Sequence, residues 1–219
     1  MIKGIRSFFY IGLVLLTILS CSQETASNGV EVINDQLDVD EEFVKQALAL
    51  TKDNDQLVFS EGAFGAFGYS NLSYEINVES LTEKFSNYNI EILKYSGFSE
   101  EGENDYFVGW KGSSIFVVVP KFDNKYAVDN VRVESTGIVD EYGVKVGMTY
   151  KQLKMLRPNN GKIELNIVTQ QPQLSFENSS IFYTFCCSDV QKEIYTTEDL
   201  MSMKIQSITW SSTINFPEH

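Results

Sequence analysis

Two segments of the chain carry apolar side chains at helical spacing. They are "NVESLTEKFSN" and "MTYKQLKMLRP", with apolar positions at Val78, Leu81 and Phe85 and at Tyr150, Leu153 and Leu156. Residues three and four apart share one face of a helix, so each segment predicts a short amphipathic helix. Asn77 and Thr149 precede the two patterns and are suited to cap them. Arg157 ends the second pattern, before Pro158, and is expected to interact favourably with the C-terminus of that helix or to cap its carbonyls.

Strand-forming segments follow each predicted helix. Those after the first are 90–95, "DYFVGWK", "SSIFVVVP" and "VDNVRVES"; those after the second are 162–168, "PQLSFE", "SSIFYTFCC" and "IQSITWSS". The letters "SSIF" occur at 113–116 and again at 179–182, and Trp110 and Phe176 take corresponding places upstream. A turn is expected at "FDNK" and a further helical turn at "TTEDLMSM". The chain therefore reads as two similar halves, each a helix and four strands.

One-faced helices need a sheet to cover, which predicts an α+β domain. We expect an antiparallel sheet of roughly eight strands, built from two helix-plus-four-strand halves, with the helices packed on one face. The domain would span residues 56–219, with halves at about 56–136 and 137–213, and a short helix would precede it within 40–55. Strand order does not follow from the pattern.

The N-terminus has a different pattern. Lys3 and Arg6 precede an apolar run from Phe8 to Leu19, which is the layout of a secretory signal and is shorter than the roughly 20 residues of a membrane-spanning helix. The run ends in "ILSC", which resembles the lipobox of bacterial lipoproteins. We expect residues 1–20 to be a lipoprotein signal peptide and Cys21 to carry the lipid, so that the chain is anchored to a membrane without spanning it. The alternative is an ordinary signal peptide with a cysteine nearby.

The residues after Cys21 bear on sorting. Residues 21–39 are polar and acidic without a period, which predicts a flexible tether. Ser22 is not the aspartate of an inner-membrane retention signal, and Glu24 alone does not make an acidic surface-export signal. We therefore expect an outer-membrane anchor facing the periplasm, with surface exposure as the alternative.

Composition narrows the chemistry. The formal net charge is −13, and the predicted signal peptide carries only basic charges, so nucleic-acid binding is not expected. The single histidine is His219, the last residue, which argues against a Ser-His-Asp triad, a Cys-His pair and a histidine metal site. We predict no catalytic residue, no metal site and no cofactor. The loop "SEEGENDY" lacks the ligand order of a calcium loop.

Two further features leave alternatives open. Cys186 and Cys187 are adjacent, so they form either one buried and one exposed thiol or a strained, redox-sensitive vicinal disulfide. The segment "VFSEGAFGAFGYS" alternates glycine with aromatic residues, which either fill the core or form an aromatic lip. In the second case the segment would contribute to an exposed interaction surface made of Phe64, Phe67, Tyr69 and Trp110.

Three stretches resemble a known family. "SYEINVESLTEKFSNYNIEILKYSG", "VRVESTGIVDEYGVKVGMTYKQL" and "IQSITW" are similar to the domain of the sigma-E-regulated bacterial lipoproteins, with Gly137, Gly143, Gly147, Thr149 and Trp210 among the shared features. The resemblance spans about 68–211 and implies an α+β fold of unknown function. The family's two separated cysteines are vicinal here, so no disulfide is carried over. The helix-then-strands halves also look like the tandem repeat of β-lactamase inhibitor proteins.

Two functions remain. The first is a non-catalytic binding module, anchored through Cys21, whose partner is an envelope protein, a lipid or a glycan. The second is a hydrolase of the cell envelope that works with carboxylates alone. The hydrolase predicts a cleft with two or more acids, one of them unusually buried. We expect the first function and no enzyme activity.

Overall fold

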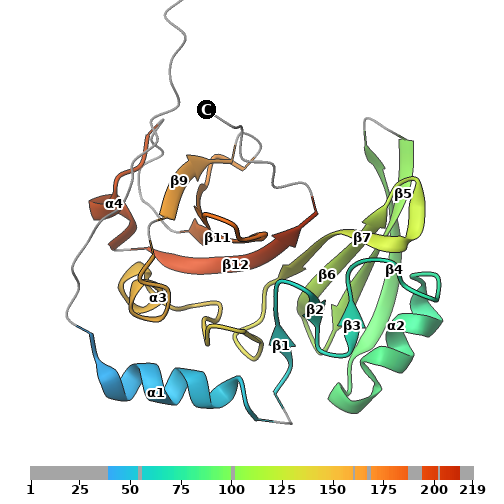
Figure 1. The fold of residues 1–219 in the computed structure, drawn as a ribbon. Helices are drawn as coiled ribbons and strands as arrows, with labels where there is room; N and C mark the ends of the chain where they lie inside the picture. The colour runs from blue at the N-terminus through green and yellow to red at the C-terminus, as the bar shows by residue number, and fades with distance from the viewer. Residues whose placement is uncertain are drawn as a thin grey trace, which may run out of the picture.

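An eight-stranded antiparallel sheet forms the centre of the molecule (Figure 1). The computed structural model describes residues 39–53, 56–99, 102–159, 161–166, 169–186, 194–201 and 203–212. The strands are β4 (Glu91–Ser99), β5 (Gly102–Trp110), β6 (Ser114–Lys121), β7 (Asn124–Val133), β9 (Gly161–Leu165), β10 (Pro172–Phe176), β11 (Ile181–Cys186) and β12 (Lys204–Ser211). The predicted signal peptide, Cys21, Cys187 and His219 lie outside the described residues. The α+β class and the antiparallel eight-stranded sheet are confirmed.

The strand order is β4-β5-β6-β7-β12-β11-β10-β9. Each strand pairs with its neighbour in the sequence except at the centre, where β7 pairs with β12. There Arg132 lies opposite Thr209, although the two residues are far apart in the chain. The predicted turn at "FDNK" joins β6 to β7, and the predicted helical turn in "TTEDLMSM" is α4 (Thr197–Met201).

The two predicted amphipathic helices are present, and their caps are as expected. In α2 (Val78–Lys84) the Asn77 side chain accepts from the Ser80 N–H, and in α3 (Tyr150–Leu156) Thr149 accepts from the Gln152 N–H. The side chains of Ser80 and Gln152 accept in return from the backbone of the cap residues, so each helix starts with a full capping box. A further helix, α1 (Glu41–Leu50), begins after its cap Asp40.

One hydrophobic core lies on one face of the sheet. Leu81 of α2 and Leu153 of α3 are fully buried in the same cluster as the sheet residue Phe116, so both helices pack on that face. In Figure 1, α2 lies beside β4 and α3 lies beneath β12. Because side chains alternate along a strand, every second residue of the central strands points away from this core.

A second, smaller sheet was not predicted from the sequence. It has the order β3-β2-β1-β8 and consists of β1 (Val58–Phe59), β2 (Ala63–Phe64), β3 (Phe67–Gly68) and β8 (Val139–Asp140). Each strand has only two residues, which is too short to show alternation. The glycine-aromatic segment supplies three of these strands, and its phenylalanine side chains are buried in the core.

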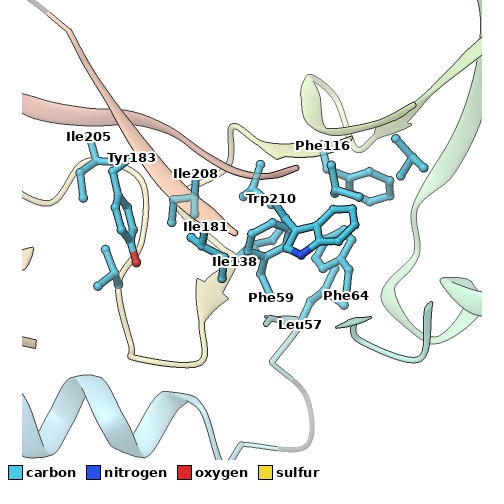
Figure 2. Packing of buried hydrophobic residues seen from close by; sticks show 14 of the residues in the cluster. Leu57, Phe59, Phe64, Phe116, Ile138, Ile181, Tyr183, Ile205, Ile208 and Trp210 are labelled. Carbon is cyan, nitrogen blue, oxygen red and sulfur yellow. The ribbon is translucent and has the colours of Figure 1, made fainter. Parts of the chain in front are cut away.

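Of the two alternatives for the glycine-aromatic segment, core filling is confirmed, and the exposed interaction surface is wrong for three of its four residues. Phe64 and Phe67 are fully buried, and Tyr69 is 2% exposed. The Phe64 ring meets Phe116 edge-on, with 4.9 Å between ring centroids (Figure 2). Tyr69 stacks on Trp210 with 4.1 Å between ring centroids. Phe64 and Phe67 also pack against the Phe85 ring. The three aromatic side chains are therefore part of the hydrophobic core, where burial of large rings is most favourable.

The repeated letters "SSIF" do not occupy equivalent positions. In the first copy, Phe116 is in the core. In the second copy, Ile181 is in the core, and Phe182 lies opposite Thr209 on the other face of the sheet. The upstream pair also differs, since Trp110 is 39% exposed and Phe176 is buried. A shift of one residue moves a side chain to the other face of a strand, so identical letters here have opposite environments.

Candidate functional site

The face of the sheet away from the core is the first candidate, and we call it the open face. Strand register places Val108, Val117, Arg132, Thr209 and Phe182 in one row across five strands. Their sequence neighbours Phe107, Phe116, Val133, Ile208 and Ile181 are buried in the core, which fixes the direction of the row. Arg132 is exposed, Val117 and Phe182 are partly exposed, and Val108 and Thr209 are each 8% exposed. The row therefore forms a surface that is accessible in its middle and at Phe182.

A hollow of about 250 Å³ lies in the middle of the open face. It is lined from β6, β7, β12, β11 and β10 and from the turn between β9 and β10. Eight of its twelve lining residues carry an amide or a hydroxyl group, three are apolar and one is Arg132. Arg132 is ion-paired with Glu134 at 2.8 Å. The hollow is therefore a polar and almost uncharged surface in an acidic protein.

Aromatic rings lie beside the hollow on the same face. The rings of Tyr95 and Tyr106 stack at 5.5 Å with an interplanar angle of 16°. They lie opposite each other on β4 and β5, and alternation with the buried Ile92 and Phe107 places them on the open face. Tyr95 is 46% exposed. Of the predicted interaction surface, Trp110 alone is accessible, at the end of β5.

The second candidate is a buried polar cluster that the sequence did not indicate. The Asp140 carboxylate accepts hydrogen bonds from the Tyr183 hydroxyl at 2.5 Å, from the Val144 N–H at 2.8 Å and from the Tyr142 N–H at 2.9 Å. Arg157 donates to the Tyr183 hydroxyl at 3.0 Å. The cluster thus joins β8, β11 and the end of α3.

The position of Arg157 differs from the prediction. Its guanidinium lies 3.9 Å from the Tyr142 ring centroid and 4.2 Å from that of Phe176, instead of capping the helix carbonyls. Arg157 is 6% exposed. A planar guanidinium stacks well between aromatic rings, and here that contact takes the side chain away from the helix end.

The protonation of Asp140 follows from its burial. Loss of hydration raises its pKa from 3.8 to about 6, although the hydrogen bond from Tyr183 opposes the shift. Burial also raises the pKa of Tyr183 above its ordinary value. Asp140 and Tyr183 are both fully buried, so neither reaches a ligand at the surface. The cluster therefore has a structural role, because it links β8, β11 and the end of α3 by hydrogen bonds.

Acids also gather at a hollow of about 270 Å³ beside the start of α2. Three acids line it, Glu75, Glu79 and Asp105. Two of them are ion-paired, Asp105 with Lys94 at 2.8 Å and Glu75 with Lys125 at 3.5 Å. The hydrogen bond from Lys94 lowers the pKa of Asp105. A general acid needs a raised pKa to hold its proton near neutral pH, and Asp105 has the opposite shift.

The remaining candidates are the predicted cysteine pair, a metal site and a membrane-spanning helix. Cys186 lies at the end of β11, but Cys187 is outside the described residues, so the redox pair stays a prediction. Within the described residues no group of three or more His, Cys, Asp or Glu side chains could hold a metal ion. The described helices include none that is long and apolar enough to cross a membrane.

The fold defines an α+β protein with an eight-stranded antiparallel sheet, and the described helices that join the core, α2, α3 and α4, leave its open face free. The chain is similar to the crystal structure of the uncharacterized protein yfeY from Escherichia coli, with a TM-score of 0.54 and 16% sequence identity, over 69% of this chain and 97% of that one. At this identity the similarity concerns the fold alone. No protein-family model matches the sequence. No curated protein matches it either.

Sequence reasoning missed the hollow and the buried cluster. The hollow combines side chains from five strands whose order was unknown, so no local motif could reveal it. Asp140 had a weak signal in "VDEYG", where an acid follows the apolar Val139 and comes three residues before Gly143. An aspartate that accepts from the backbone two and four residues ahead is typical of a turn, which is its role here.

Proposed function

We propose that the chain is a lipid-anchored envelope protein that binds its partner through the open face and has no catalytic activity. The observation that carries the proposal is the hollow in the middle of that face, where two distant parts of the chain meet at β7 and β12. Central strands have all their backbone groups paired, so their outward side chains form a rigid, preorganised surface. Such a surface suits recognition.

The anchor part of the proposal rests on the N-terminal sequence. A basic start, a short apolar run and Cys21 follow the order of a lipoprotein signal, and the chain also resembles the sigma-E-regulated lipoproteins. We place the anchor in the outer membrane, facing the periplasm. Two or three acyl chains would hold the protein firmly, because each buried methylene contributes about 0.8 kcal/mol.

The alternative, a hydrolase that works with carboxylates alone, has less support. It requires an accessible cleft in which one of at least two acids keeps its proton. Asp140 has the raised pKa but no access to solvent, and Asp105 has access but a lowered pKa. Neither acid combines the two properties, which favours the binding function.

We also infer that the domain consists of two helix-plus-four-strand halves, about 56–136 and 137–213. In its support, α2 is followed by β4 to β7, after the short 3-10 helix η1 (Ser86–Tyr88), and α3 is followed by β9 to β12, with α4 inserted before β12. On each side of the central pair, the last strand of a half is innermost and its first strand is at the edge: β7, β6, β5, β4 on one side and β12, β11, β10, β9 on the other. The halves would place the hollow at their junction.

Fractionation of cells that express the wild-type chain and Cys21→Ala tests the anchor. The wild type is expected in the outer-membrane fraction, with a mature N-terminus that carries acyl chains in mass spectrometry. The Cys21→Ala chain should not be lipidated and should leave the membrane. An unmodified Cys21 in the mature protein, or cleavage at another position, would refute the anchor. A pull-down from envelope membranes tests binding, and no specific partner for the anchored form would refute it.

A further inference from the structure

We infer that the hollow of the open face binds a neutral oligosaccharide. This inference rests on the proposed binding function and names the chemical class of the ligand. The first argument is charge. The chain has 30 acidic and 17 basic residues, yet none of the twelve residues that line the hollow is acidic. Its one cation, Arg132, is already paired with Glu134. A charged ligand would find no free countercharge, whereas a neutral ligand needs none.

The second argument is the supply of hydrogen-bonding groups. Gln173 donates to the Thr184 hydroxyl at 3.3 Å and Gln171 to Gln206 at 2.6 Å, which fixes both amides. The carbonyl oxygen of each amide makes no further hydrogen bond to the described residues and remains an acceptor. The Thr209 hydroxyl likewise bonds no described residue. Closely spaced amides and hydroxyls match the vicinal hydroxyl groups of a sugar ring.

The third argument is the mixture of these groups with apolar rings. Phe182 lies in the hollow, opposite Thr209 on the neighbouring strand. The stacked pair Tyr95 and Tyr106 extends the same face toward β4. A sugar ring has an apolar face of C–H groups and a polar rim, so it can lie on an aromatic side chain while its rim meets amides.

The position of the hollow argues against an extended peptide. Peptides that bind to sheets usually add as a strand at an edge, where backbone groups are free. Here the edges are β4 and β9, and the hollow is lined by the five strands β6, β7, β12, β11 and β10 between them and by side chains of the turn after β9. Recognition in the hollow therefore depends on side chains. Its volume of about 250 Å³ is below the roughly 300–1,000 Å³ of pockets for drug-sized molecules, which suits one sugar ring of a longer chain.

The test is an array of neutral and anionic oligosaccharides, probed with the full mature chain in a detergent that has no sugar headgroup. The strongest neutral glycan is then titrated against the wild type and against Thr209→Val, which removes the hydroxyl with little change in volume. Thr82→Val, on the exposed side of α2, is the matched control. We expect neutral glycans to be retained, Thr209→Val to weaken binding about two- to tenfold, and the control to bind like the wild type.

Three results would overturn the inference: no neutral glycan is retained, only anionic glycans are retained, or Thr209→Val binds as tightly as the wild type. Its failure can be told apart from failure of the proposed function. If no glycan binds but a bulky substitution in the hollow abolishes capture of a polypeptide from the envelope, the open face is a protein-binding surface and only the ligand class is wrong.

Discussion

At the scale of single residues, the buried cluster of Asp140, Tyr183 and Arg157 makes the clearest prediction for stability. The Tyr183 hydroxyl donates to the carboxylate and accepts from the guanidinium. Tyr183→Phe leaves both charged groups buried without their shared partner, so we expect the free energy of unfolding to fall by about 1–3 kcal/mol. Urea denaturation measures the change.

Tyr142→Phe is the matched control for this substitution. Its ring keeps the contact with Arg157 at 3.9 Å, and the Tyr142 side chain is partly exposed. We expect a change of less than about 0.5 kcal/mol. Equal losses for the two variants would mean that the hydroxyl of Tyr183 is not a structural link.

Asp140 also predicts a dependence of stability on pH. Because burial raises its pKa from 3.8 to about 6, the folded protein keeps a proton here that the unfolded chain has already lost. The free energy of unfolding contributed by this group therefore falls as the pH rises from about 4 to about 6. Asp140→Asn cannot ionise and should lose this part of the slope. Parallel pH profiles for the two proteins, from urea denaturation, would contradict the assignment.

Individual residues could be predicted where local chemistry determines them. Asn77 and Thr149 were identified as caps because a cap acts within its own turn. The burial of Phe64, Phe67 and Tyr69 could be given only as one of two alternatives, since glycine-aromatic alternation has the same pattern in a core and on a surface. Their environment depends on Phe116 and Trp210, which come from distant parts of the chain.

At the scale of elements, α1 is held by a close contact with the turn after β8. Gly143 has φ of +82°, and a Cβ atom there would lie 2.8 Å from the backbone carbonyl of Ala47 in α1. Gly143→Ala would combine backbone strain with this clash, so we expect α1 to move away. Its amide protons should lose protection in hydrogen exchange.

Gly112→Ala separates the two effects. Gly112 has a similar φ of +77°, but a Cβ atom there would meet nothing within 4 Å. This variant has the backbone strain alone, about 1–2 kcal/mol. We expect Gly143→Ala to cost about 1–3 kcal/mol more, as an overpacked contact does. Equal unfolding free energies for the two variants would show that α1 is not packed on this turn.

Whether each longer element is a helix or a strand could be predicted from the sequence. Which side chains of a strand face the core could not always be predicted. Both amphipathic helices and the alternating strands were predicted from their periods. The two copies of "SSIF" illustrate the limit, because they differ by one residue in register and point Phe116 and Phe182 to opposite faces. Register is set by pairing with other strands, which a local pattern does not contain.

At the scale of the whole molecule, the pairing of β7 with β12 creates the surface that we propose for binding. It brings Val117 and Arg132 beside Thr209 and Phe182 in one sheet. The sequence predicted the sheet but not the order of its strands, and the hollow exists only because of that order. A non-local site of this kind cannot be found from spacing along the chain.

Capture of envelope material by a chain with a blocked open face tests the central claim most directly. Val117→Arg places a long charged side chain in the hollow, and Val78→Arg makes the same change at an exposed position of α2. Both anchored variants are compared with the wild type in pull-downs from envelope membranes, with equal stability confirmed by urea denaturation. We predict that Val117→Arg loses the captured partner and that Val78→Arg retains it. Retention by both variants would contradict binding through the open face.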